Sequence, residues 1–458
     1  MDFQRVLSLV EERKDEYLEM LFTLLRQKSI SSQNDGVVEC ADLLKGMMED
    51  IGVSTQIFKT EGQPIIYGEI MTDPSNLTIL FYGHYDVQPV DPLHQWLSPP
   101  FEPTIRNGKI YCRGVGDNKG QLITHLLAIK TMLDVCGELP INVKFVFEGE
   151  EESTSVSLPV FVENHKELLK TDLVYTADGP MPVGGEPLVL LGVRGVLCVE
   201  LAVKEAEWDN HSGNKGNIVP NPAWTLVELL ATMRDQDQRV TIEGFYDDIL
   251  PATQAELDLL KKLPYDNQKI GKEIGYDKLN MDGETYYRKL TLEPTFNIQG
   301  FVSGYGGEGS KTIIPSEAKV KVDFRLVLDQ NPKDIFDKVA AHVKIHAPGV
   351  EVKFLGSMEP SRTPYGNRLV KVIEQAVEKS YNQEPIVQPS LGGSLPDYVW
   401  TKILNVPSVV VPYANFDEQN HSPNENLNLE NFYNGIKCTC HVIECLGAYS
   451  KEQMKISK

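Results

Sequence analysis

The chain lacks the long apolar runs that membrane-spanning proteins need. No uninterrupted apolar stretch in its 458 residues approaches the ~18 residues of a membrane-spanning helix. The opening segment, MDFQRVLSLVEERKDEYLEMLFTLLRQ, is typical of an acidic amphipathic helix rather than of a signal peptide. We therefore expect a cytoplasmic protein without a membrane partner.

Positive charge is also scarce. The sequence has 44 Lys and Arg residues against 65 Asp and Glu residues, which gives a formal net charge of −21. An acidic chain repels phosphate backbones and anionic lipid. Nucleic-acid partners are therefore not expected.

Cysteine is sparse, and the seven residues are an odd number. A disulfide framework usually shows an even number of closely spaced cysteines, so we expect reduced thiols. The sequence also has no G-x-S-x-G motif, which makes a serine or cysteine hydrolase the weakest of the hydrolase hypotheses. It shows no internal repeat and no low-complexity segment.

Two clusters outside the acidic motifs could in principle bind a metal. The first combines Cys438, Cys440 and Cys445 with His441 in LENFYNGIKCTCHVIECLGAYS. We predict a helix there, and because residues i and i+2 of a helix face apart, packing is the preferred interpretation. The second cluster, His342 with His346, shares one face of another predicted helix. No acidic motif lies nearby, so we favour a solvated or core-edge role.

What the sequence does contain is a set of acidic and histidine residues at the ends of predicted strands. His84 and Asp86 end the apolar run LTILFYGHYDV, and a strand places residues i and i+2 on one face. Glu151 and Glu152 follow the apolar run INVKFVF. The remaining members are Asp117 in RGVGDNKG, Asp178 in YTADGP and His421 in EQNHSPNE.

This set predicts a site for two divalent metal ions. Open α/β sheets place their sites at the carboxyl ends of strands, where these residues lie. Carboxylates gathered near a core repel one another unless cations neutralise them. Imidazole and carboxylate ligands suit zinc, with manganese or cobalt as alternatives. Asp117, at a tight strand-to-helix turn, could bridge two ions, and Asp86 could either bind a metal or orient His84.

The motifs resemble those of a known enzyme superfamily. The order of G-H-Y-D-V, G-D-N-K-G, F-E-G-x-E-E-S, D-N-H-S-G (209–213) and G-G-S (392–394), ending in His421, is similar to the zinc-dependent aminoacylase and carboxypeptidase G superfamily. The branch it resembles most is that of the carnosinase-like cytosolic dipeptidases. Thr154 and the residues after Ser394 depart from the usual pattern.

The resemblance implies a role for each motif residue. Two ions would share one bridging carboxylate, and a glutamate would act as general base. The resemblance also implies a cis peptide bond between Asp117 and Asn118. The implied roles are His84 and Asp178 for one metal, Asp117 as the bridge, Glu152 and His421 for the other metal, Glu151 as the base, and Asp86 as the carboxylate that orients His84.

Further residues would bind substrate. Arg325, in VDFRLV, lies on a predicted strand and should meet a carboxylate, either of the substrate or in an internal salt bridge. Gly392, Gly393 and Ser394 form a loop whose backbone can approach a substrate carboxylate. The resemblance implies that Thr312 helps to hold that end. It also implies that His211 reaches the active site of the neighbouring subunit and stabilises the oxyanion, so a homodimer is expected.

The predicted fold is α/β with an inserted lid. Residues 1–190 alternate helices and apolar strands, the pattern of a mostly parallel sheet with helices on both faces. Residues 191–361 suggest a ferredoxin-like βαββαβ lid and dimerisation domain, with one strand hidden near TFNIQGFV. Residues 362–458 would complete the catalytic domain.

These features predict a di-metal hydrolase that cleaves dipeptides with a free C-terminal carboxylate. A water bridging the two ions would attack the scissile carbonyl while Glu151 removes its proton. The long stretch 239–294 is either a solvent-exposed elaboration or a feature of dipeptidases, because deacylases that resemble the chain lack such an expansion. The alternatives are an N-acyl amino acid deacylase, of the acetylornithine deacetylase or succinyl-diaminopimelate desuccinylase type, and a non-catalytic binding protein.

Overall fold

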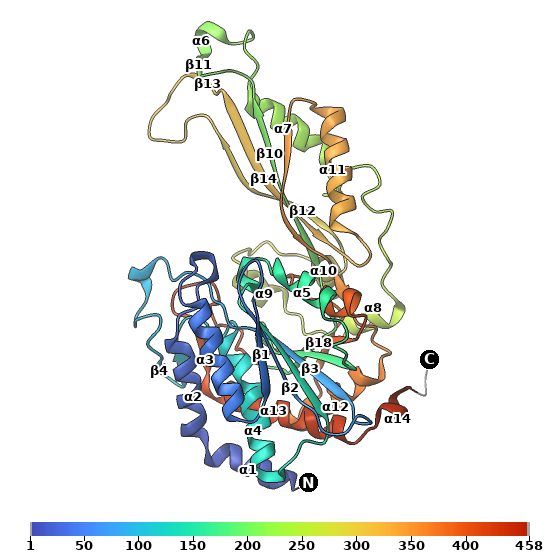
Figure 1. Ribbon diagram of the computed structural model, residues 1–458. Helices are drawn as coiled ribbons and strands as arrows, with labels where there is room; N and C mark the ends of the chain where they lie inside the picture. Colours follow the sequence, from blue (N-terminus) through green and yellow to red (C-terminus); the bar gives the residue numbers. More distant parts are fainter. Residues whose placement is uncertain (1, 456–458) are drawn as a thin grey trace.

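The computed structural model describes residues 2–455 and shows two large β-sheets in two parts of the molecule. Figure 1 shows the larger sheet in the lower part, with both termini, and the smaller sheet standing above it. The apolar core of the lower part is separate from the core of the upper part. No helix of residues 2–455 is long and apolar enough to cross a membrane.

The larger sheet has eight strands and is mostly parallel at its centre. β3 pairs in parallel with β6 and β7, and β7 pairs in parallel with β18. Antiparallel pairs join β1 to β2, β2 to β6 and β8 to β18. The predicted mostly parallel sheet is confirmed. In sheet order the strands are β1 (Ser54–Phe58), β2 (Ile65–Ile70), β6 (Asn142–Glu148), β3 (Thr78–His84), β7 (Leu173–Thr176), β18 (Ser408–Val410), β8 (Leu188–Leu190) and β17 (Ile386–Gln388).

Helices cover both faces of this sheet because its central strands are apolar on both faces. In β3, Ile79 and Phe81 face one apolar cluster, whereas Leu80 and Tyr82 face another. The N-terminal segment, predicted as one helix, forms two that meet at Arg13. The first cluster contains α1 (Phe3–Glu12), α2 (Lys14–Arg26), α3 (Val37–Asp50), α4 (Lys119–Cys136), α12 (Arg368–Tyr381) and α13 (Leu429–Gly447), and the second contains α5 (Ser157–Asn164) and the π-helix η4 (Val399–Ile403).

The smaller sheet has the predicted βαββαβ order, including the hidden strand. Its four strands are antiparallel, and α7 and α11 pack on it. Its elements in chain order are β10 (Gly195–Lys204), α7 (Pro222–Met233), β12 (Thr295–Ser303), β14 (Glu317–Leu326), α11 (Pro332–His346) and β15 (Glu351–Met358). At its far end lie β11 (Asn210–His211), α6 (Ser212–Lys215) and β13 (Ile313–Ile314).

The chain crosses between the two parts twice, at β9 (Gly192–Val193) and β16 (Ser361–Arg362). These two short strands pair with each other. On this basis we propose domain boundaries at 190/191 and 361/362, which divide the chain into 1–190, 191–361 and 362–458.

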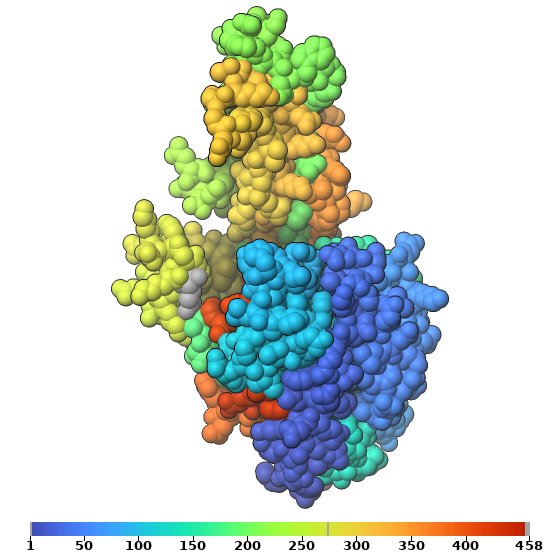
Figure 2. Space-filling view, turned by 90° about the vertical axis from the view of Figure 1, so that its left-hand side faces the viewer, coloured from blue at the N-terminus to red at the C-terminus, as the bar shows by residue number. Residues whose placement is uncertain are grey.

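The stretch 239–294 forms three short helices beside the junction. Figure 2 shows part of it, in yellow, bulging next to the place where the two parts meet. The helices are α8 (Gln254–Leu260), α9 (Asn267–Glu273) and α10 (Gly283–Thr291). The elements not yet mentioned are η1 (Ser31–Gln33), η2 (Leu93–Gln95), β4 (Thr104–Arg106), β5 (Lys109–Tyr111), η3 (Glu151–Ser153), β19 (Asn426–Asn428) and α14 (Lys451–Lys455).

All seven cysteines are free thiols, as expected. Cys438 and Cys440 are buried in α13, in agreement with the packing interpretation. His342 is buried at the edge of the smaller core, where its Nε2 lies 2.8 Å from the Thr232 hydroxyl, and its ring stacks on His346.

Candidate metal centre

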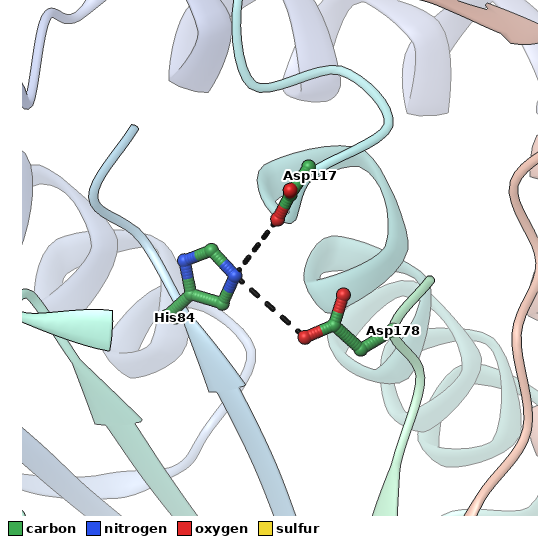
Figure 3. Close-up of side chains that lie close together, drawn as sticks. All are labelled: His84, Asp117 and Asp178. Atoms are coloured by element: carbon green, nitrogen blue, oxygen red, sulfur yellow. Dashed lines mark ion pairs between the residues drawn. The ribbon is translucent and has the colours of Figure 1, made fainter. Parts of the chain in front are cut away.

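The centre begins where β3 ends. His84 is the last residue of β3 and is fully buried. Its Nε2 lies 3.0 Å from Asp117 Oδ1 and 3.7 Å from Asp178 Oδ2. Figure 3 shows the imidazole pointing at both carboxylates, which come from the start of α4 and the end of β7. These three side chains form the first candidate ligand group.

A second group shares Asp117 with the first. His421 Nε2 lies 3.1 Å from Asp117 Oδ2 and 3.2 Å from Glu152 Oε2. Within each group the ligand atoms all lie within 4.8 Å of one another. The two oxygens of Asp117 therefore face different histidines, which is the arrangement a bridging carboxylate needs. The cis peptide bond between Asp117 and Asn118, predicted from the resemblance, is present.

The residues of both groups fit divalent metal ions. His84 Nε2 is buried without a hydrogen bond of acceptable geometry in the described residues. No lysine or arginine within residues 2–455 forms an ion pair with Asp117, Glu152 or Asp178. Imidazole and carboxylate together are a donor set that zinc, manganese and cobalt accept.

The pKa values of these groups show how strongly the cluster attracts positive charge. Burial and the charge of Asp117 raise the pKa of Asp178 to about 7. Hydrogen bonds to Asp117 and Glu152 raise the pKa of His421 to about 10. Burial alone would raise the pKa of Asp117, but the two histidine rings beside it hold that pKa well below its usual range. The cluster therefore favours protons or cations between its carboxylates.

Asp86 lies behind His84 and belongs to neither group of described residues. Its carboxylate accepts the backbone N–H groups of Glu151 (3.2 Å) and Glu152 (3.1 Å), and its Oδ1 is 3.3 Å from His84 Nδ1. One buried carboxylate thus fixes the ring of a candidate ligand and the backbone of two neighbouring glutamates. This geometry favours the orienting role over direct metal binding.

The neighbouring glutamates point in different directions. Burial, together with the charges of Glu152 and Asp178, raises the pKa of Glu151 well above its usual range. The Glu150 carboxylate instead accepts the backbone N–H of Ser157 at 3.0 Å, at the start of α5. Of the two, Glu151 is the one whose pKa is shifted by burial and by the charges of the candidate ligands His84, Glu152 and Asp178.

Sequence reasoning missed Glu425, which is almost fully buried. Its carboxylate accepts the backbone N–H groups of Gly114 (2.9 Å), Gly116 (2.9 Å) and Asp117 (3.0 Å), and the Arg113 guanidinium at 2.8 Å. Glu425 therefore holds the turn that carries the shared carboxylate. It is the last residue of the segment EQNHSPNE that contains His421, but nothing in that segment indicates a role for it.

Glu148, at the end of β6, lies in the F-E-G-x-E-E-S motif, which assigned it no role. It is fully buried and accepts the hydroxyls of Tyr82 (2.6 Å) and Ser155 (2.9 Å). Burial raises its pKa to about 8. Its two hydroxyl partners, Tyr82 in β3 and Ser155 after η3, hold Glu148 at the strand end.

The predicted substrate residues separate into two places. Arg325 Nη1 donates to Ser394 Oγ at 2.8 Å, so Arg325 contacts the Gly392–Ser394 loop. Its only ion pair in the described residues is a long one, 3.8 Å, to Asp323. His211, the last residue of β11, and Thr312, the residue before β13, lie close together, since Ser212 N–H donates to the Thr312 carbonyl at 3.1 Å. Figure 1 places β11 and β13 at the end of the smaller sheet farthest from β3.

Comparison with known proteins identifies the family. Residues 80–444 match Peptidase family M20/M25/M40. The chain belongs to this family. Membership confirms the resemblance inferred from the motifs and the prediction of an enzyme of the metallopeptidase class.

The relatives of this M20 chain include dipeptidases. It is 29% identical over 384 residues to human "Beta-Ala-His dipeptidase", covering 82% of this chain and 76% of that protein. It is 27% identical over 482 residues to "Cys-Gly metallodipeptidase dug1" of Schizosaccharomyces pombe, covering 98% and 99%. The crystal structure of "M20 family metallo-carboxypeptidase Sso-CP2" from Sulfolobus solfataricus superposes with a TM-score of 0.91 at 37% identity, covering 95% of this chain and all of that one. The predicted fold is confirmed.

Proposed function

We propose that this protein is a di-metal dipeptidase that hydrolyses the peptide bond of dipeptides with a free C-terminal carboxylate. The observation that carries the proposal is the pair of histidine and carboxylate groups that share Asp117 beside Glu151. The names of the human and Schizosaccharomyces pombe relatives support the dipeptide as substrate.

Two divalent ions would be held by the two groups, with zinc as the first candidate and manganese or cobalt as alternatives. When bound, such ions lower the pKa of water and polarise a carbonyl oxygen. His84 and Asp178 would hold one ion, Glu152 and His421 would hold the other, and Asp117 would contact both. The buried Asp86 keeps the His84 ring in the orientation that directs Nε2 at its ion.

Glu151 is proposed to move the proton. It would take a proton from the attacking water and return it to the leaving amine as the C–N bond breaks, so that a free amino acid and a new carboxylate are released. The raised pKa of Glu151 suits a group that both accepts and donates a proton. Because Asp86 accepts its backbone N–H, the position of Glu151 is tied to that of His84.

Recognition of the C-terminal carboxylate is proposed for Arg325 with Gly392, Gly393 and Ser394. The contact between Arg325 and Ser394 supports this assignment, because it places a guanidinium beside a loop with flexible backbone. Since the side chain of Arg325 is one-third exposed, it is accessible to a substrate.

A homodimer is proposed because His211 and Thr312 lie far from the metal centre of their own chain. Eight residues of β14 separate Glu317 near the tip from Arg325 near the junction, which is roughly 25 Å at the usual strand rise. The edge strand β12 also exposes Ile298, Phe301 and Val302, and edge strands readily pair with another chain. A second copy would cover this edge and receive His211 and Thr312 in its own site.

A metallo-carboxypeptidase acting on longer chains is the second candidate. The superposition on Sso-CP2 at 37% identity favours it, since that protein is named a metallo-carboxypeptidase. Both activities would use the same metals, Glu151 and a free C-terminal carboxylate. They differ in whether the site accepts residues on the amino side of the dipeptide.

The experiment is a substrate panel with zinc, manganese or cobalt added in turn. It contains β-Ala-His, Cys-Gly and other dipeptides, their C-terminal amides, tetrapeptides, and N-acetyl amino acids. A dipeptidase cleaves free dipeptides fastest, a carboxypeptidase cleaves tetrapeptides at least as fast, and a deacylase prefers N-acetyl amino acids. No hydrolysis of any substrate by metal-loaded protein would leave only the binding-protein alternative.

We also propose a cytoplasmic location. The support is the absence of any disulfide among seven cysteines, which suits a reducing compartment. Fractionation of cells that express the protein with its natural termini would test this, and recovery in a membrane or secreted fraction would contradict it.

A further inference from the structure

The stretch 239–294 ends on the loop proposed to bind the substrate carboxylate. A Cβ atom added to Gly392 would lie 2.9 Å from Leu290 Cδ1 and 3.2 Å from the Leu290 carbonyl oxygen. Contacts this short leave no room for a side chain, so the last turn of α10 packs directly on the loop backbone. The sequence allowed the stretch 239–294 to be a solvent-exposed elaboration. This end of the stretch is instead packed against the loop.

Arg194 joins the same two segments through hydrogen bonds. It lies between β9 and β10 and is only 7% exposed. Its Nε donates to the Gly392 carbonyl at 2.9 Å, and its Nη1 donates to the Glu293 carbonyl at 3.2 Å. The single buried guanidinium of Arg194, between β9 and β10, therefore holds both the loop and the end of the 239–294 stretch.

The first helix of the stretch, α8, is anchored at the second crossing. Arg362 Nε of β16 lies 2.9 Å from Glu256 Oε1 of α8, and both side chains are less than one-tenth exposed. Tyr287 of α10 donates its hydroxyl to the Pro264 carbonyl at 2.6 Å, and so ties α10 to the chain that follows α8. The stretch is thus fixed at both ends instead of hanging from the surface.

Arg325 acts on the same loop from the smaller sheet. In the register of the sheet, Arg325 lies opposite Val196 of β10 and opposite Thr295 of β12. Val196 follows Arg194 by two residues, and Thr295 follows Glu293 by two residues. Its contact with Ser394 Oγ therefore lies close to the contact of Arg194 with Gly392. Two guanidinium groups therefore hold this three-residue loop. Arg194 binds the carbonyl of its first residue, Gly392, and Arg325 binds the hydroxyl of its last residue, Ser394.

We propose that Arg194 and Leu290 are positioning residues that fix the Gly392–Ser394 loop beside Arg325, and that the 239–294 stretch thereby sets selectivity for a free C-terminal carboxylate. The inference rests on the proposed function. Because the Gly392 carbonyl is engaged by Arg194, it is kept from repelling a substrate carboxylate. Leu290 prevents the loop from moving away from Arg325.

The kinetic test uses the free dipeptide with the highest kcat/KM in the panel and its C-terminal amide. Arg194→Gln should raise KM for the free dipeptide by about tenfold, with kcat changed by less than about twofold, because the variant loses the charged hydrogen bonds to the Gly392 and Glu293 carbonyls and leaves the candidate metal ligands and Glu151 unchanged. Arg194→Lys should restore part of the loss, and Leu290→Ala should raise KM by about threefold. KM for the amide should change little. The matched control is Ile274→Ala, an exposed residue that ends α9 in the same stretch, which should behave as wild type.

Hydrogen exchange gives a readout that does not depend on turnover. Backbone amides of residues 388–396 should exchange faster in Arg194→Gln and in Leu290→Ala, and at the wild-type rate in Ile274→Ala. Unchanged exchange in both variants, or equal losses for the free dipeptide and its amide, would overturn the proposal. Wild-type protein that cleaves no dipeptide would overturn the proposed function, whereas the exchange experiment would still decide whether Arg194 and Leu290 hold the loop.

Discussion

The two parts of the molecule distribute their candidate functional residues in opposite ways. In the part built on the eight-stranded sheet, the five candidate ligands gather in two groups whose ligand atoms lie within 4.8 Å. In the part built on the four-stranded sheet, Arg325 lies near the junction, whereas His211 and Thr312 lie at the far end. Charge compensation works only at contact distance, so the chemistry needs one buried cluster. Recognition can be spread out, provided that another chain or a movement brings its residues to the substrate.

The largest effect is expected from Asp117→Ala, which removes the carboxylate shared by both groups. Both ions should be lost together, and turnover should fall by more than about 10³-fold, because metal ions contribute several kcal/mol to such reactions. Elemental analysis and dipeptide hydrolysis would measure the two losses, with Asp42→Ala, on the exposed face of α3, as the matched control. An inactive Asp117→Ala protein that keeps two ions per chain would contradict the role of Asp117 as the bridging ligand.

Glu151→Gln should separate chemistry from metal binding within the same cluster. The variant should keep both ions and the fold while kcat falls by about 10²-fold or more, the usual contribution of a general base. Glu150→Gln is the matched control, because that carboxylate binds the start of α5, and its kcat should stay close to wild type. A collapse in Glu150→Gln with normal turnover in Glu151→Gln would exchange the two roles.

His211→Ala tests whether the far end of the smaller sheet serves another chain. Loss of an oxyanion donor should lower kcat by about 10²-fold, whereas His346→Ala on the exposed surface of α11 should have no effect. Mixing inactive His211→Ala and Glu151→Gln chains under subunit exchange should restore activity, because one site of the heterodimer carries neither lesion. Mixtures that stay inactive after proven exchange would place His211 outside the partner's site.

The smallest of these effects should come from Arg325→Ala. Losing a charge-assisted contact costs about 1.5–3 kcal/mol, so kcat/KM for free dipeptides should fall by roughly ten- to a hundredfold. C-terminal amides serve as the internal control and should lose much less, since they carry no carboxylate. Equal losses for both substrates would remove Arg325 from carboxylate recognition and leave the smaller sheet with a purely structural role near the junction.

The fold could be predicted largely from apolar periodicity. A helix was expected in LENFYNGIKCTCHVIECLGAYS, where α13 spans Leu429–Gly447, and the hidden strand near TFNIQGFV is β12. The prediction of a single N-terminal helix was wrong, because a continuous amphipathic pattern does not show the break at Arg13. Periodicity reports which face of an element is buried, and it says little about where a helix bends.

Only the residues of the candidate site that lie in sequence motifs could be predicted. His84, Asp117 and His421 carry recognisable motifs, and strand ends indicated that they would meet. Glu425 and Arg194 could not be found in this way, since each acts on backbone groups of a distant segment. Contacts between a side chain and a distant backbone leave no local pattern, so only the folded structure reveals them.

Because Glu425 supports the turn at Asp117, the order in which the chain is synthesised affects when the candidate site can form. The two residues are 308 positions apart in the chain, and synthesis at about 5–20 residues per second separates their appearance by roughly 15–60 s. His421 also emerges late. For most of that interval a nascent chain has four of its five candidate ligands, lacks His421, and has a turn without its support, so we expect any loading with metal to follow synthesis.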